Sequence, residues 1–257
     1  LRSLVGSEMC IRDRYIIREY SEAVKNFSCG AKSNDKKKRK KIRNIDIDDF
    51  SYNGLVSYDM AIGLTSQFKS QYNNDNTTIY NRLVEIVNLL NLVYQNSFGC
   101  YFTLNETNQN SIFNSTSFDN SNNNIQDFTG YFNSIISSSS YNIGHVLGVG
   151  DGGVAYLNAL CGGLKGGGFS AVPDITNDQV LVVDYMAHEV GHQFGCNHIH
   201  QNCASEPNRN VEPGSGSTIM GYAGICPPNI QNYSDPYFNR ISIWEALEHR
   251  STLSCGN

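Results

Sequence analysis

Three histidines and one glutamate lie close together in the segment 188–198. On an α-helix, residues four apart share a face, so His188 and His192 can direct two imidazole nitrogens at one cation. Gly195 can adopt the positive φ that ends a helix, so that the chain turns back and delivers His198 as a third ligand. Three neutral imidazoles suit Zn²⁺ and leave its fourth position open for water, which is typical of a catalytic site.

Glu189 directly follows the first of these histidines. A general base for zinc-bound water must stand at this place, beside the open position of the metal. The pattern H-E-x-x-H-x-x-G-x-x-H fixes five positions, and each has its own physical need. The alternative interpretation, ordinary surface histidines on an amphipathic helix, leaves Gly195 unexplained. We therefore predict a metal site in which His188, His192 and His198 bind Zn²⁺ and Glu189 is catalytic.

The spacing of hydrophobic residues predicts the elements that must position this segment. The predicted strands are residues 55–62, 98–104, 142–148 and 154–160. The predicted helices are residues 79–94, 127–137, 177–194 and 241–249. The polar tract 105–124 is expected to be a surface loop and the glycine-rich residues 162–168 a flexible loop. Strands and helices mix before the long helix and an irregular region follows it, which indicates an α/β (α+β) fold.

A methionine follows the histidine segment by some twenty residues, within Ser217–Tyr222. Together with the extended histidine motif, this stretch resembles the metzincin clan of zinc endopeptidases. Within the clan, the reprolysin (adamalysin)-like group is the most similar. Residues 141–146, 153–161 and 212–220 carry this resemblance, which covers residues 50–257. Reprolysins usually carry Asp after the third histidine, where this sequence has Ile199, so the clan is the more secure assignment.

The resemblance implies a zinc-dependent endopeptidase. The expected fold is a twisted, mostly parallel five-stranded sheet with helices in an upper subdomain, above an irregular lower subdomain, with the metal cleft between them. Met220 would form an apolar floor beneath the metal, and Tyr222 is similar to a tyrosine that donates to the oxyanion in related enzymes. Tyr222 packed in the wall is an equally good interpretation. An extended protein or peptide substrate would pair with an edge strand made by Gly152, Gly153, Val154, Ala155 and Tyr156.

The charge of the chain is divided unevenly. The total is −5, which divides into +5 over residues 1–49 and −10 over residues 50–257. So few basic residues in the larger part argue against nucleic-acid binding. No apolar run is long enough for a membrane span.

Residues 1–14 resemble translated adaptor sequence and are predicted to be non-native. Residues 15–49 are interpreted as a prosegment remnant and basic linker, and residues 50–257 as the catalytic domain. By resemblance, Cys29 is a candidate inhibitory thiol of the prosegment, and the basic run 36–43 is a candidate processing site. In the alternative, Cys29 forms a disulfide and the basic run is a solvated linker.

Eight cysteines without a C-x-x-C pair, and five N-x-[ST] sequons, favour a secreted or extracellular glycoprotein, or the ectodomain of a longer surface protein. The alternative is a cytosolic protein with free thiols. If Cys10 is not native and Cys29 is free, the remaining six suit three disulfides. These six are Cys100, Cys161, Cys196, Cys203, Cys226 and Cys255. His145 is interpreted as structural, and His200 as a residue of the lower subdomain. Calcium binding and the oligomeric state stay open.

Two other functions compete with the endopeptidase. The first is a catalytically silent zinc-binding adhesion or interaction module of the same fold, against which the intact Glu189 argues. The second is a surface protein with a structural metal, which predicts that metal removal unfolds the chain.

Overall fold

The computed structural model describes Lys32 and residues 54–115, 118–119, 125–201 and 210–256. Cys29 and the basic run 36–43 lie outside these residues. The strands are β1 (Val56–Leu64), β2 (Cys100–Leu104), β3 (Ile143–Val149), β4 (Gly152–Ala155) and β5 (Gly168–Val172). The helices are α2 (Ser66–Ser70), α3 (Asn76–Phe98), α4 (Glu106–Phe113), α5 (Phe128–Ile135), the short η2 (Ser138–Ser140), the π-helical η3 (Gln179–Met186), α6 (Ala187–Gln193) and α7 (Arg240–Arg250).

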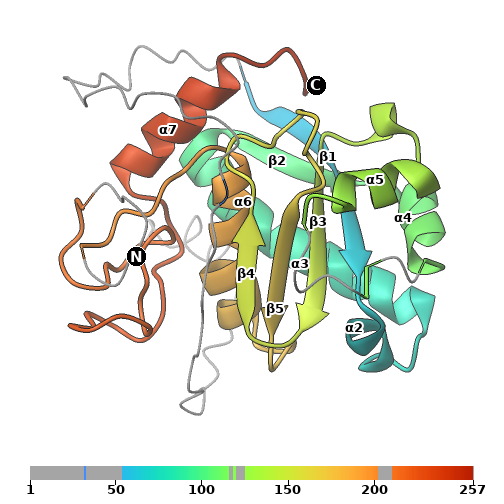
Figure 1. The fold of residues 1–257 in the computed structure, drawn as a ribbon, viewed down its shortest axis with the longest axis horizontal. Coiled ribbons are helices and arrows are strands. Elements are labelled where there is room, and N and C mark those ends of the chain that lie inside the picture. The colour runs from blue at the N-terminus through green and yellow to red at the C-terminus, as the bar shows by residue number, and fades with distance from the viewer. Residues whose placement is uncertain (1–31, 33–53, 116–117, 120–124, 202–209, 257) are drawn as a thin grey trace, which may run out of the picture.

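The five strands form one sheet in the order β2-β1-β3-β5-β4 (Figure 1). β1 runs parallel to β2 and to β3, and β3 runs parallel to β5. Only β4, at the edge, is antiparallel to its neighbour β5. The long helix α3 makes the crossover from β1 to β2 that a parallel pair requires. The predicted mostly parallel five-stranded sheet is confirmed.

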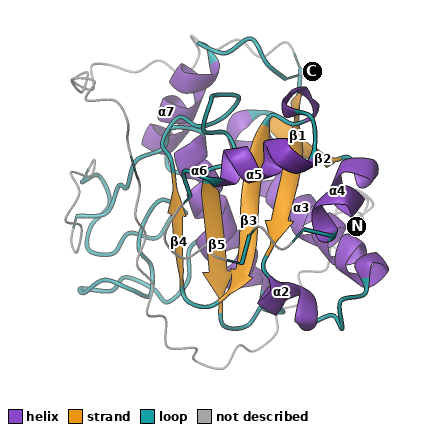
Figure 2. Cartoon of the chain, turned by 45° about the vertical axis from the view of Figure 1, so that its right-hand side comes forward, coloured by secondary structure: helices purple, strands orange, loops and turns teal. Residues whose placement is uncertain are grey.

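Helices cover both faces of the sheet (Figure 2). Successive residues of the central strands point to opposite faces, so each of these strands contributes side chains to the core on either side. Ile62 and Leu147 belong to the larger hydrophobic core, which includes the buried face of α3 and the η3–α6 run. Their neighbours Ala61 and Val146 belong to a second core, with buried residues of α4 and α5. The sheet is therefore buried on both sides, and α6 packs on the side of α3.

Helix α3 follows the predicted periodicity, and its capping residues set its length. The Asp75 side chain accepts hydrogen bonds from the backbone N–H groups of Thr77 and Thr78 at the first turn. Gly99, with φ of 62°, ends the helix in the left-handed conformation that a C-cap uses. The helix thus begins and ends some residues outside the range 79–94 that hydrophobic spacing alone predicted.

The predicted surface loop 105–124 is wrong over its first part, because α4 occupies Glu106–Phe113. Asn105 caps this helix by accepting from Asn108 N–H. The buried Gln109 side chain bonds both the N–H and the C=O of Ile62 on β1. A polar residue thus takes the place of an apolar one on the inner face, and hydrophobic periodicity misses such a helix.

Two predictions near the sheet edge also need correction. The strand predicted over 154–160 is β4 and spans only Gly152–Ala155. The chain then leaves the sheet, since Asn158 has a φ of 59° and donates its N–H to His192 O of α6. The expected flexible loop 162–168 ends in β5, whose five residues are all buried.

The cysteine pairing differs from the three disulfides predicted. Cys161 and Cys255 form a disulfide that ties the loop after β4 to the C-terminal segment. Cys226 is also disulfide-bonded. Cys100 and Cys196 are free thiols, fully buried in the larger core, where a thiol behaves as a small apolar group. Counting cysteines cannot distinguish this role from pairing.

The segment between α6 and α7 carries, in its described part, only turns and isolated β-bridges. This agrees with the irregular lower subdomain that was predicted. None of the helices in the described residues is both long and apolar enough to cross a membrane.

Candidate metal centre

The candidate metal centre is built on the continuous run of η3 and α6, which passes through the core. His188 and His192 lie one turn apart on α6 and are buried. The helix stops at Phe194, and Gly195 has a φ of +100°, as predicted. The chain then reverses, so that His198 returns to the two helical histidines.

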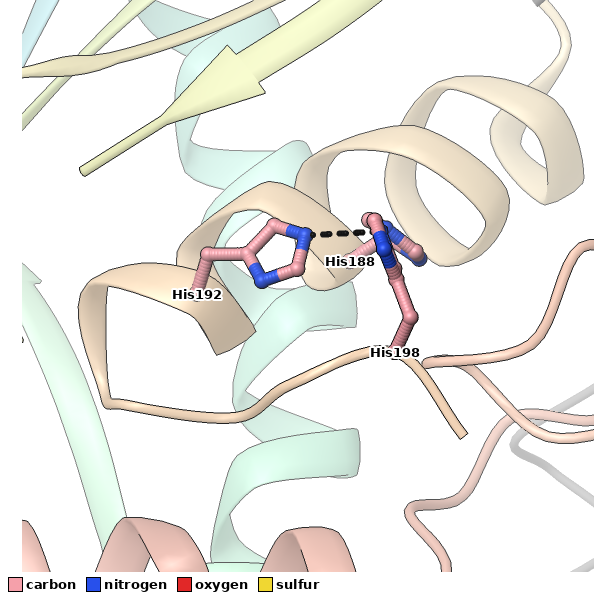
Figure 3. A group of neighbouring side chains, drawn as sticks. All are labelled: His188, His192 and His198. Atoms are coloured by element: carbon pink, nitrogen blue, oxygen red, sulfur yellow. Dashed lines mark hydrogen bonds between the residues drawn. The ribbon is translucent and has the colours of Figure 1, made fainter. Parts of the chain in front are cut away.

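The three imidazole rings converge through their Nε2 atoms (Figure 3). His198 Nε2 lies 3.1 Å from His188 Nε2 and 3.1 Å from His192 Nε2. One nitrogen carries at most one hydrogen, so His198 can donate in only one of these contacts. A tetrahedral Zn²⁺ with ordinary Zn–N bonds holds its ligand nitrogens about 3.3 Å apart and uses all three lone pairs. The donor set and its spacing therefore fit a zinc ion.

Backbone carbonyls fix which nitrogen of each helical histidine faces the others. His188 Nδ1 lies 2.7 Å from Ile219 O, and His192 Nδ1 lies 2.7 Å from Cys196 O. A carbonyl oxygen only accepts, so each Nδ1 donates its hydrogen. Each Nε2 is then left with the lone pair that binds a metal, the usual arrangement of outer hydrogen bonds around metal-binding histidines.

Burial also keeps these rings neutral. Desolvation lowers the pKa of His192 to about 4. Desolvation, with added repulsion from His192, lowers the pKa values of His188 and His198 well below the ordinary value. The neutral ring is the form that binds a metal, so the site is prepared for a cation at neutral pH.

Glu189 is fully buried in the first turn of α6, next to His188 in the sequence. Its side chain lies against the edge strand β4 at Gly153. The glutamate thus follows a predicted metal ligand in the sequence and packs against the edge strand of the sheet.

A sequence model of the reprolysin-like metallopeptidases of family M12B matches residues 56–248, which span the sheet, the histidine segment and most of α7. The chain belongs to this family. No curated protein matches it. Among the solved structures that match is one titled "Structure of a chaperone-substrate complex", with 19% identity and a TM-score of 0.40. The alignment covers 76% of this chain and 35% of that one, so the chain spans about a third of that structure's length.

In this reprolysin-like chain, Met220 is fully buried beneath α6. It follows Ile219, whose carbonyl accepts the hydrogen bond from His188 Nδ1. The ring centroid of Tyr222 lies 4.8 Å from that of His198. Its ring also stacks on that of His200 at 4.2 Å. Tyr222 therefore lies against a predicted metal ligand, while Met220 lies against Gly191, between the two helical histidines in the sequence.

The two remaining histidines that the sequence singled out are buried. His145, on β3, contacts Gln193 Oε1 through Nδ1 and Ser170 Oγ through Nε2. It lies in the core between the sheet and α6 and outside the three-histidine cluster. His200 is part of the loop segment and packs on Tyr222. These positions agree with the structural role predicted for His145 and with the place in the irregular lower subdomain predicted for His200.

Glu212 is a residue of the site region whose role the sequence did not reveal. Its buried carboxylate accepts hydrogen bonds from Ser217 N–H, Thr218 N–H and Thr218 Oγ1. It also accepts one from Asn239 Nδ2, at the start of α7. The turn that leads to Met220 is thus organised around one carboxylate. A lone Glu before a Pro-Gly turn gives no periodic signal of this role.

The edge strand has a partner from the N-terminal part of the chain. Lys32 forms a parallel bridge with Tyr156. The Lys32 N–H donates to Ala155 O at 3.0 Å, and Leu157 N–H donates to Lys32 O at 3.0 Å. β4 is at the edge of the sheet, so these bonds use the backbone groups that β5 leaves open.

Proposed function

We propose that this chain is a zinc-dependent endopeptidase that hydrolyses peptide bonds of proteins, with Glu189 as general base. The observation that carries the proposal is the convergence of the His188, His192 and His198 Nε2 atoms beside a buried glutamate. Zinc, when bound, polarises a carbonyl and brings the pKa of water near 7.

The protein residues supply the proton transfers. Glu189 takes a proton from the attacking water as the water oxygen adds to the scissile carbonyl carbon. The same carboxyl returns that proton to the leaving amine as the C–N bond breaks. Tyr222, beside His198, is our candidate donor to the developing oxyanion.

The substrate would lie extended along β4 and the adjoining Tyr156. This strand is the antiparallel edge of the sheet, and the bridge of Lys32 with the adjoining Tyr156 supports this placement. A peptide that adds to this edge would gain main-chain hydrogen bonds whatever its sequence. Its scissile bond would then lie near Glu189, which packs against the same strand.

The test is a peptide-cleavage assay on the zinc-loaded protein. Glu189→Gln should keep the zinc and lose cleavage by at least about 10²-fold, because the amide cannot accept the proton. Glu106→Gln, on the exposed first turn of α4, is the matched control and should cleave like the wild type. Undiminished cleavage by Glu189→Gln overturns the mechanism.

The same assay distinguishes the rival functions. A silent adhesion module would bind zinc and cleave nothing. A structural metal site would unfold when a chelator removes the ion, whereas the proposed enzyme becomes an inactive but folded domain. Circular dichroism after chelation separates these outcomes.

We also propose that the protein is a secreted glycoprotein made as a zymogen. The Cys161–Cys255 disulfide is consistent with an oxidising compartment. The asparagines of the four described sequons, Asn76, Asn105, Asn114 and Asn232, are exposed, as a glycan requires. Lys32 on the substrate edge supports residues 15–49 as a prosegment, removed within 36–43. Mass spectrometry of the secreted protein tests the N-terminus and the glycans.

A further inference from the structure

The Glu189 side chain occupies the space that a side chain at position 153 would need. A Cβ built on Gly153 would lie 2.3 Å from Glu189 Oε1, 2.7 Å from Cγ and 2.8 Å from Cδ. These distances are well inside van der Waals contact, which for two carbon atoms begins at about 3.5 Å. A change at position 153 must therefore displace the glutamate or the strand.

The backbone of Gly153 does not itself require glycine. Its neighbour Gly152 has a φ of +138°, a conformation that other residues rarely adopt, but Gly153 has no positive φ. The need for glycine at 153 thus comes from the contact with Glu189, which supplies the three nearest atoms, and alanine there probes that contact.

Neither the backbone of Gly153 nor the side chain of Glu189 can easily move to make room for a methyl group. Gly153 is paired with Ser170 in the antiparallel β4–β5 ladder, which holds the strand in place. Tyr185, one turn before Glu189, donates its hydroxyl to Asp151 Oδ1 at 2.8 Å and so ties the helix to the start of β4. Glu189 is fully buried, so any new position for its carboxylate displaces other atoms.

A second glycine repeats the arrangement one helical turn further along α6. A Cβ on Gly168 of β5 would lie 2.5 Å from Gln193 Oε1 and 2.5 Å from His145 Nδ1. Glu189 and Gln193 are four residues apart and so share one face of the helix. Two glycines, one on the edge strand β4 and one on its neighbour β5, therefore make room for two polar side chains of α6.

We propose that Gly153 is a positioning residue for the general base: its missing side chain sets where the Glu189 carboxylate lies relative to the edge strand and the histidines. This inference rests on the proposed function. An alanine there shifts the carboxylate away from its place, and a shift of about 1 Å in a catalytic group can cost about 10²-fold in rate. Zinc binding does not involve Glu189 and is unaffected.

The kinetic test compares Gly153→Ala with Gly163→Ala, an exposed loop glycine with open space around it. Gly153→Ala should lower kcat by about 10²-fold, with KM little changed and with the zinc content of the wild type. Gly163→Ala should leave all three unchanged. A Gly153→Ala variant with wild-type kcat overturns the proposal.

A thermal unfolding cycle on the zinc-loaded proteins tests the contact without activity. Gly153→Ala should lower the Tm when Glu189 is present and leave it unchanged in a Glu189→Ala background, which lacks all three clashing atoms. If Gly153→Ala does not fold, folding of the double variant supports the contact and its failure overturns it. An equal loss of Tm in both backgrounds also overturns it. A wild type without peptidase activity would overturn the proposed function, and the unfolding cycle would still decide the contact.

Discussion

Met220 packs directly against Gly191, in the middle of the helix that carries the two histidines: a Cβ on Gly191 would lie 2.7 Å from Met220 Sδ. The ring carbon Cε1 of Phe238 would lie 3.0 Å from the same Cβ. The methionine turn can therefore approach α6 closely only because Gly191 has no side chain. This approach also brings Ile219 O to His188 Nδ1.

We expect Gly191→Ala to destabilise the protein by about 1–3 kcal/mol, because the added methyl group overpacks a filled core. It should also weaken zinc binding, since Ile219 moves away from His188. Gly130→Ala is the control: this glycine is exposed on α5 with open space around it, and alanine there stabilises a helix by up to about 1 kcal/mol. Denaturant unfolding and zinc titration measure both effects. A Gly191→Ala variant as stable as the wild type would contradict the packing.

Tyr222→Phe separates the two interpretations of this tyrosine. Phenylalanine keeps the ring that stacks on His200 but lacks the hydroxyl. If the hydroxyl donates to the oxyanion, kcat should fall on the order of 10²-fold with little change in Tm. Unchanged kcat means that Tyr222 is only part of the wall. Steady-state kinetics on one peptide substrate decides between them.

Glu212→Gln should destabilise the turn that leads to Met220. The amide replaces a carboxylate oxygen with a donor, so the N–H groups of Ser217 and Thr218 lose acceptors inside the protein. The expected cost is about 1–3 kcal/mol, measured by denaturant unfolding. The exposed Glu106→Gln serves again as control. Equal stability of the two variants would show that the carboxylate does not organise the turn.

Alkylation should distinguish the free thiols from the bonded ones. Without reductant, Cys100 and Cys196 should resist alkylation in the native protein, since both are fully buried, and react once it is unfolded. Peptide mapping should find Cys161 joined to Cys255. Removing this bond by a double Cys→Ser change should cost about 2–5 kcal/mol. A peptide that joins Cys100 to Cys196 would refute the assignment.

His145 should contribute to acid sensitivity. Burial lowers its pKa from 6.5 to about 4 in the folded protein, while the unfolded chain keeps the ordinary value. The unfolded state therefore binds more protons between these two values, so the stability present above pH 6.5 is lost as the pH falls to 4. His145→Gln should reduce the slope of stability against pH in this window by up to about 1.4 kcal/mol per unit. Identical slopes for the two proteins would contradict the shift.

The sequence by itself determined the histidine cluster and much of the framework. His188 and His192 share a helix face because of the local period of the helix, and Gly195 reverses the chain within a few residues. The long helix α3 and the three parallel strands β1, β2 and β3 were predictable for the same reason. Their patterns are local and periodic.

Only the tertiary structure decided what closes around that cluster. Gly153 against Glu189, Met220 against Gly191 and the Ile219 carbonyl on His188 all join segments that lie far apart in the sequence. The β5 strand was missed because its glycine looked like loop, although that glycine makes room for side chains of α6. Such requirements depend on which surfaces meet, and no local pattern of residue types records that.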